Sequence, residues 1–225
     1  MMKMHFIHAI DNLKLMIAQI TAKVEHSVHL AVNAVKERSV TIARNVIIND
    51  AEVNNMEIKI EEECLKILAL YQPVAGDLRQ VITILKINNE IERIGDLAVN
   101  IAERVPDMAT YNLDKIENFE FDDMVDKVTE MLRKSLDSMT YYDVITAAEV
   151  IRLDDGVDEI HRDNYRKTRE MILKHSQAAD YYLDCLTVSR CLERIADSAT
   201  NIAEDMIYLE SGKIVRHLHD EENNK

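Results

Sequence analysis

Apolar residues recur every three to four positions along almost the whole chain, which is the spacing of α-helices that bury one face. Few residues interrupt this pattern, since only 4 Gly and 2 Pro occur among 225 residues. Hairpins and tight loops need Gly where φ is positive, so a chain this poor in turn residues favours long helices joined by short connections. The pattern therefore predicts an all-α protein.

Capping and breaking residues divide the chain into six expected helices. Ser39 and Asp143 can each accept hydrogen bonds from exposed N–H groups at a helix start. Pro73 and Gly76 are expected to stop the helix that Ser39 begins, because Pro has no N–H group and Gly tolerates the turn. The other expected helices cover about residues 4–36, 74–104, 121–141, 143–175 and 178–210, with a connection at 106–118 and a frayed tail at 217–225.

The chain contains an internal repeat. Residues 92–103 return 101 positions later as residues 193–204, and nine of the twelve positions are identical. The preceding helices match at an offset of 104, which aligns Ser39 with Asp143. A repeat of this length indicates duplication of a structural unit. We therefore predict two tandem, pseudo-symmetric, antiparallel three-helix bundles, residues 1–110 and 111–225.

The composition excludes several classes of function. The formal net charge is −14, with 41 acidic and 27 basic residues, which argues against nucleic acid as a partner and favours cations or a basic protein surface. No run approaches the roughly 18 uncharged apolar residues of a membrane span, so we expect a soluble, cytoplasmic protein without membrane insertion. The four glycines are too far apart for dinucleotide or phosphate loops. The three cysteines form no CxxC pair and are expected to be buried thiols.

Oxygen-bearing side chains are repeated on one face of the expected helices. Spacings of four and seven residues place such side chains on one side of a helix. If the second and third helices of each unit pack antiparallel, the two sets face each other and their like charges repel unless a cation lies between them. The candidate metal ligands are Asp50, Asn54, Glu57, Glu92 and Asp96 in the first unit, and Asp154, Asp158, His161, Glu193 and Asp197 in the second.

Oxygen-rich sets of this kind suit Fe, Mn or Mg, and Zn where His161 contributes. An ordinary solvated acidic face is the alternative, in which Arg93 and Arg194 pair with the Asp residues three positions later. His161 is a metal ligand under the first interpretation and an ordinary helix-surface residue under the second.

The order of these motifs resembles the PhoU family of phosphate-uptake regulators. The resemblance rests on residues 73–79 (PVAGDLR), followed by IERIGD at 91–96 and, in the second unit, LERIAD at 192–197. It implies two three-helix bundles whose E(D)xxxD motifs bind multinuclear clusters of iron or zinc. It also implies a cytosolic accessory protein that contacts the phosphate ABC transporter ATPase and the phosphate-sensing histidine kinase, and that keeps phosphate-starvation genes off. A homodimer is expected as well.

The motif positions transfer to Glu92 and Asp96 in the first unit and to their repeats in the second. The first unit has Asn54 where the second has Asp158, so we expect the first site to bind metal more weakly. The rival hypothesis is a metalloenzyme of the di-iron carboxylate type, which uses E-x-x-H motifs. The chain has only Asp158-x-x-His161 and no evident nucleophile or general base, which favours a regulatory module over an enzyme.

Overall fold

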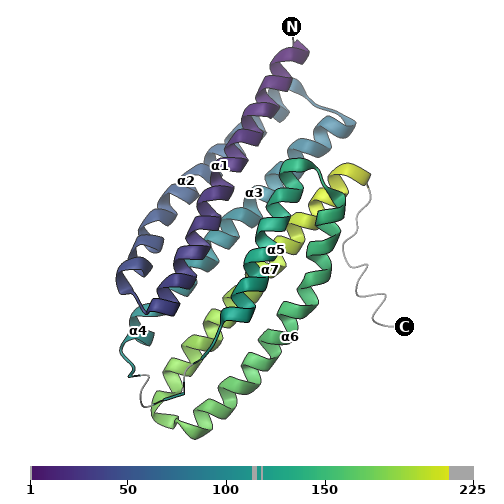
Figure 1. Ribbon diagram of the computed structural model, residues 1–225. Helices are drawn as coiled ribbons and strands as arrows, with labels where there is room; N and C mark the ends of the chain where they lie inside the picture. Colours follow the sequence, from purple (N-terminus) through teal and green to yellow (C-terminus); the bar gives the residue numbers. More distant parts are fainter. Residues whose placement is uncertain (1, 113–115, 118, 213–225) are drawn as a thin grey trace, which may run out of the picture.

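The computed structural model describes residues 2–112, 116–117 and 119–212 and consists of long helices packed side by side (Figure 1). The chain forms, in order, α1 (Met2–Glu37), α2 (Val40–Tyr71), α3 (Ala75–Ala102), a short α4 (Val105–Ala109), α5 (Asp122–Tyr141), α6 (Val144–Lys174), a 3₁₀ turn (Ser176–Ala178) and α7 (Ala179–Ser211). The predicted all-α class and its helical bundles are confirmed. The expected connection at 106–118 and the expected tail at 217–225 lie partly and wholly outside the described residues.

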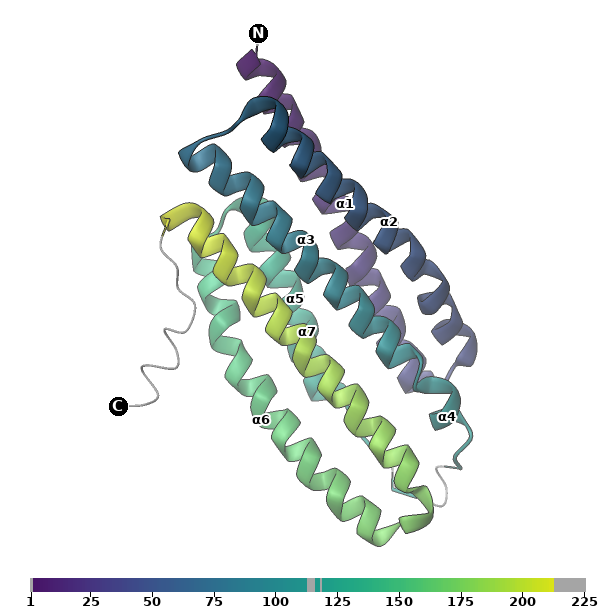
Figure 2. The ribbon, with the colours of Figure 1, turned by 180° about the vertical axis from the view of Figure 1, so that it is seen from behind.

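Two sets of three helices make up the molecule. Helices α1, α2 and α3 pack against one another, and so do α5, α6 and α7. The third helices of the two sets, α3 and α7, also pack directly together, and both lie in the middle of the molecule in Figure 2. Each of these central helices therefore has one face toward its own set and another toward the opposite set.

Both expected N-caps form. The Ser39 side chain accepts a hydrogen bond from the N–H group of Ile42 at the start of α2 (3.4 Å). The Asp143 side chain accepts hydrogen bonds from the N–H groups of Ile145 (2.9 Å) and Thr146 (3.2 Å) at the start of α6. These bonds satisfy N–H groups that have no partner inside the helix, so the two second helices begin in equivalent registers.

The end of α2 differs from the expectation for Gly76. The helix ends at Tyr71, and Gln72 takes the left-handed conformation (φ 45°) directly before Pro73. Gly76 lies inside the first turn of α3, where a Cβ atom would meet nothing within 4 Å. The break is therefore made by Pro73 and its neighbours, because a proline restricts the residue before it and cannot continue the helix.

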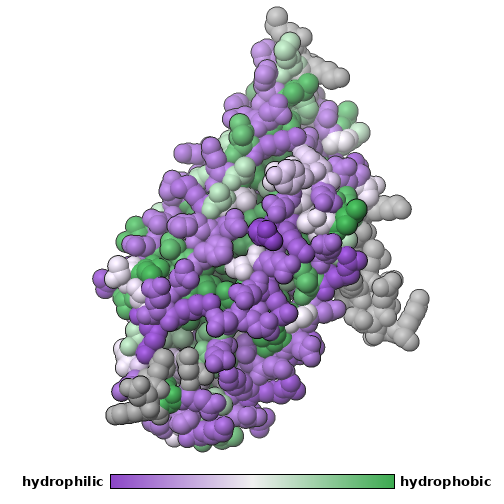
Figure 3. Space-filling view, in the orientation of Figure 1, coloured by the Kyte–Doolittle hydropathy of each residue, from purple (hydrophilic) through white to green (hydrophobic). Residues whose placement is uncertain are grey.

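The core consists mainly of aliphatic residues from all the long helices, with some aromatic, methionine and cysteine side chains, and α3 and α7 contribute residues along most of their lengths. The three cysteines are free and buried, as predicted. The face seen in Figure 3 is mostly hydrophilic, with separate apolar patches. No described helix is both long enough and apolar enough to cross a membrane.

Candidate functional site

In the first bundle, carboxylates of α2 and α3 meet across the helix interface. Burial raises the pKa of Asp50, the hydrogen bond from Asn54 opposes this rise, and the nearby Asp96 adds to it. The Asn54 Nδ2 atom donates to Asp50 Oδ2 at 2.9 Å. Burial also raises the pKa of Glu92, followed by repulsion from Asp96, Glu57 and Asp50. The five predicted residues of the first site therefore lie in one cluster, which we call the first acidic cluster.

Glu57 has a second contact in this cluster. Asn88 is fully buried on α3, and its Nδ2 atom donates to the Glu57 carbonyl oxygen (3.1 Å) and to Glu57 Oε1 (3.4 Å). Burial raises the pKa of Glu57, and repulsion from Glu61 raises it further. Asn88 thus ties α2 to α3 and holds one carboxylate at the edge of the cluster.

In the second bundle the equivalent carboxylates include an aspartate whose pKa is strongly raised. The pKa of Asp154 rises from 3.8 to about 7, first because the side chain is partly buried and then because Asp197 and Asp158 repel its charged form. Burial raises the pKa of Glu193, and repulsion from Asp197 and Asp158 follows. These four carboxylates form the second acidic cluster, in which burial and repulsion favour the protonated form of Asp154.

Asp197 also faces the first bundle. Burial raises the pKa of Asp197, and Asp158 adds to the rise, whereas Arg93 of α3 and Arg194 of its own helix oppose it. Close by, Asn201 of α7 donates a hydrogen bond to Glu90 Oε1 of α3 at 3.3 Å. The second acidic cluster is therefore in electrostatic contact with the helix that carries half of the first.

His161 lies against α7 rather than on an open helix surface. The ring is half-buried, and its Nδ1 atom is 2.9 Å from the hydroxyl oxygen of the buried Ser189, which also accepts a hydrogen bond from Asn164 (3.0 Å). Burial lowers the pKa of His161, Arg190 lowers it further, and Asp158 opposes both. The neutral ring is therefore favoured, which is the form that binds metal ions.

The repeat relates His161 and Ser189 to Glu57 and Asn88. His161 follows Glu57 by 104 positions and Ser189 follows Asn88 by 101, and each pair joins the second helix of its bundle to the third. Counting Glu57, the first cluster has as many carboxylates as the second. Glu57 thus supplies the carboxylate that the first cluster lacks at Asn54. The second cluster differs chiefly in the neutral imidazole of His161 and in the more strongly raised pKa of Asp154.

The sequence analysis did not identify Asn88 and Ser189, the buried residues that hydrogen-bond with Glu57 and His161. Asn88 and Ser189 each lie four residues before the Glu of the repeated motif, on the same helix face, so the 101-residue offset was the signal that could have found them. The contribution of Arg93 to the second cluster had no local signal, because it depends on the packing of α3 against α7.

The acidic clusters, all of whose residues are described, do not have the geometry of a preformed metal site. Among the described side chains, no three His, Cys, Asp or Glu residues are placed as they would be around one ion. The donor chemistry nevertheless fits a hard or borderline cation, because raised pKa values and facing carboxylates mark positions where positive charge would relieve repulsion. Side-chain rotation within each cluster would be needed to complete a coordination sphere.

Comparison with known proteins agrees with this architecture. The PhoU domain model matches residues 17–105 and 121–206. The phosphate-specific transport system accessory protein PhoU homolog 1 of Thermotoga maritima is 31% identical over 95% of this chain and 92% of its own length. The homolog from Pseudomonas aeruginosa is 35% identical over 87% of this chain and 81% of its own length.

Solved structures show the same fold. The crystal structure of PhoU from Pseudomonas aeruginosa superposes with a TM-score of 0.87 at 31% identity, covering 92% of this chain and all of that one. The regulatory protein PhoU from Streptococcus pneumoniae gives a TM-score of 0.82 at 25% identity over 93% of this chain and 99% of its own. The names of these relatives describe accessory or regulatory proteins of phosphate transport and not enzymes. Both halves of the chain and nearly all of its length match, and this protein therefore belongs to the PhoU family.

Proposed function

We propose that this protein is an accessory regulator of phosphate uptake that acts by binding other proteins and not by catalysis. The proposal draws on the names of the relatives, which describe phosphate-specific transport system accessory proteins, and on their match along nearly the whole chain. In this account the protein works in the cytoplasm as a homodimer and represses the response to phosphate starvation. Its partners are the phosphate ABC transporter ATPase and the phosphate-sensing histidine kinase.

The observation that supports a role for metal is the crowding of carboxylates in the second acidic cluster. Repulsion from Asp197 and Asp158, added to burial, moves the pKa of Asp154 to about 7. A divalent or trivalent cation placed among these groups would remove the repulsion and link α6 to α7. We assign this role to iron or zinc, with manganese or magnesium as substitutes, held by carboxylate oxygens and by the imidazole of His161.

The first acidic cluster would hold metal between α2 and α3 in the same way. Its oxygens come from Asp50, Glu57, Glu92 and Asp96, and the amide of Asn54 supplies one more. Metal at both clusters would fix the second helix of each bundle against its central helix. The helical surfaces that meet the transporter or the kinase would then be held in one arrangement.

A pull-down with purified components tests this function. The tagged protein is incubated with the transporter ATPase and, separately, with the cytoplasmic part of the kinase, in the presence of iron or of a chelator. We expect capture of both partners, with chelation weakening the capture. Failure to retain either partner under both conditions would refute the regulatory assignment, whereas equal capture with and without chelator would refute only the role of the metal.

A further inference from the structure

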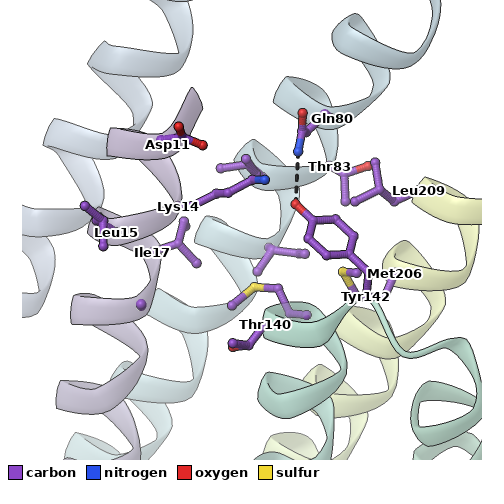
Figure 4. A pocket seen from close by; sticks show the side chains of 14 residues that line it. Asp11, Lys14, Leu15, Ile17, Gln80, Thr83, Thr140, Tyr142, Met206 and Leu209 are labelled. Atoms are coloured by element: carbon purple, nitrogen blue, oxygen red, sulfur yellow. Dashed lines mark hydrogen bonds between the residues drawn. The ribbon is translucent and has the colours of Figure 1, made fainter. Parts of the chain in front are cut away.

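A largely apolar pocket lies between the two bundles, at the end of the molecule where α5 turns into α6, and none of its lining residues belongs to the acidic clusters. Its volume is about 430 Å³, and α1, α3, α5, α7 and the residue after α5 all contribute to its lining (Figure 4). Volumes of roughly 300 to 1,000 Å³ are usual for sites that bind small molecules, and such sites occur preferentially between domains. The feature therefore has the size and the place of a ligand site.

The internal repeat provides a matched comparison for this pocket. Tyr142 follows Arg38 by 104 positions, and both residues take the left-handed conformation (φ 56° and 52°) directly before the N-caps Asp143 and Ser39. A second pocket lies beside Arg38, at the equivalent place in the other half, and its volume is only about 260 Å³. The two halves thus share a turn but differ in how completely the space beside it is filled.

Aromatic residues fill the smaller pocket. Phe119 and Phe121 have ring centroids 5.0 Å apart, and Tyr181 joins them in the lining. The Arg38 guanidinium donates hydrogen bonds to two backbone carbonyl groups there, those of Met108 and Tyr111. These contacts make the smaller pocket part of the framework of the protein.

The equivalent positions in the larger pocket carry smaller or aliphatic side chains. Leu15 and Ile17 precede Phe119 and Phe121 by 104 positions, and Gln80 precedes Tyr181 by 101. All three line the larger pocket. The larger pocket therefore has smaller or non-aromatic side chains at three positions where the other half has aromatic ones, and its volume is correspondingly greater.

Polar groups are gathered at one side of the larger pocket. The Tyr142 hydroxyl accepts a hydrogen bond from Gln80 Nε2 at 3.0 Å, which leaves its own hydrogen available to an acceptor. The Lys14 ammonium group lies 5.1 Å from the centre of the Tyr142 ring and, among the described residues, makes no ion pair. In Figure 4 the Lys14 side chain extends toward Tyr142. Thr83, which also lines the pocket, is fully buried, and its hydroxyl has no hydrogen-bond partner among the described groups.

We propose that this pocket binds one small amphiphile with an anionic head, of the medium-chain carboxylate class. The head accepts a hydrogen bond from the Tyr142 hydroxyl and pairs with the Lys14 ammonium group, and the apolar body lies against the aliphatic and methionine side chains of the lining. Asp11 also lines the pocket. Its carboxylate would repel an anionic head, so the proposal places the head beside the ammonium group that lies over Tyr142. An occupant would contact both bundles at once and hold them together at this end.

Methionine-methyl NMR with decanoate tests the proposal, because Met139 and Met206 both line the pocket. The two signals are assigned from Met139→Leu and Met206→Leu. We expect saturable shifts of both signals with decanoate below its micellar concentration. We also expect binding at least about tenfold weaker for decyltrimethylammonium, as the loss of one charge-assisted contact predicts. No shift with decanoate, or equal affinity for the cationic probe, would overturn the proposal.

Matched variants locate the binding. Ile17→Phe and Gln80→Tyr copy the residues that fill the smaller pocket, so each should abolish the shifts while circular dichroism shows an intact helical fold. Lys14→Met should weaken decanoate binding about tenfold, whereas Lys36→Met, a change at the lining of the smaller pocket, should not. Undiminished binding in both filling variants, or equal losses in the two lysine variants, would contradict the assignment to this pocket.

Discussion

Asp154→Asn should stabilise the metal-free protein at alkaline pH. The Asp154 carboxyl has a pKa raised from 3.8 to about 7 in the folded chain. An acid whose folded pKa is raised contributes stability that is fully present below its unfolded pKa and is lost as the pH rises through the folded pKa. The wild-type protein therefore loses stability between about pH 4 and pH 7 on account of this group, and the Asn variant, which has no carboxyl, does not.

The size of the effect follows from the shift. A difference of roughly 3 pKa units at 1.36 kcal/mol each gives about 4 kcal/mol. Asp154 is only half-buried, and solvent screening reduces this to about 2 kcal/mol. For a chain of this length, that corresponds to a melting temperature about 4 to 8 °C higher for the variant at pH 8.

Thermal unfolding followed by circular dichroism in chelator, between pH 4.5 and 8.5, measures this difference. The stabilisation should be constant above about pH 7 and shrink as the pH falls below it, and Glu159→Gln, at an exposed acid on the same helix, should show no such trend. A variant that is less stable than wild type at pH 8, or a difference that does not change with pH, would refute the reasoning about the second acidic cluster.

Two further predictions concern the repeated motif, one its acidic residues and the other Gly95. The double variant Glu193→Ala with Asp197→Ala should lower the iron bound per chain, measured by elemental analysis after loading, because it removes half of the second cluster. The loss should be larger than for Glu92→Ala with Asp96→Ala, because the second cluster holds the more strongly perturbed aspartate; equal losses would contradict this ranking. Gly95→Ala should raise the free energy of unfolding by about 0.5 to 1 kcal/mol in denaturant titrations, because alanine favours the helix and the added Cβ meets its nearest neighbour at 3.4 Å. A decrease in that free energy would show that the site cannot accept a methyl group.

The sequence predicted the parts of the fold that depend on local signals. Ser39 and Asp143 cap their helices as expected, because a cap requires only a side-chain acceptor next to free N–H groups. The end of α2 was misjudged at Gly76, because the left-handed conformation at the helix end is taken by Gln72 and the next residue, Pro73, cannot continue the helix. The packing of α3 against α7 was not predicted, because hydrophobic spacing identifies a buried face but not the helix that covers it.

The candidate site was predictable in its membership but not in its surroundings. Helical spacing placed the acids of each helix on a common face, as with Asp154 and Asp158, and the packing of α6 against α7 brought Asp154 close to Asp197. The contacts of His161 with Ser189 and of Glu57 with Asn88 depend on distances between helices that no spacing rule supplies. Only the internal repeat shows that these two contacts occupy equivalent positions in the two bundles.

The most direct test of the proposed metal role is anomalous diffraction from crystals grown with iron or zinc. We expect anomalous peaks between α6 and α7, within bonding distance of Asp154, Asp158 and Asp197, and further peaks between α2 and α3. Metal-loaded crystals that diffract well and show no peak beside these carboxylates would contradict the account.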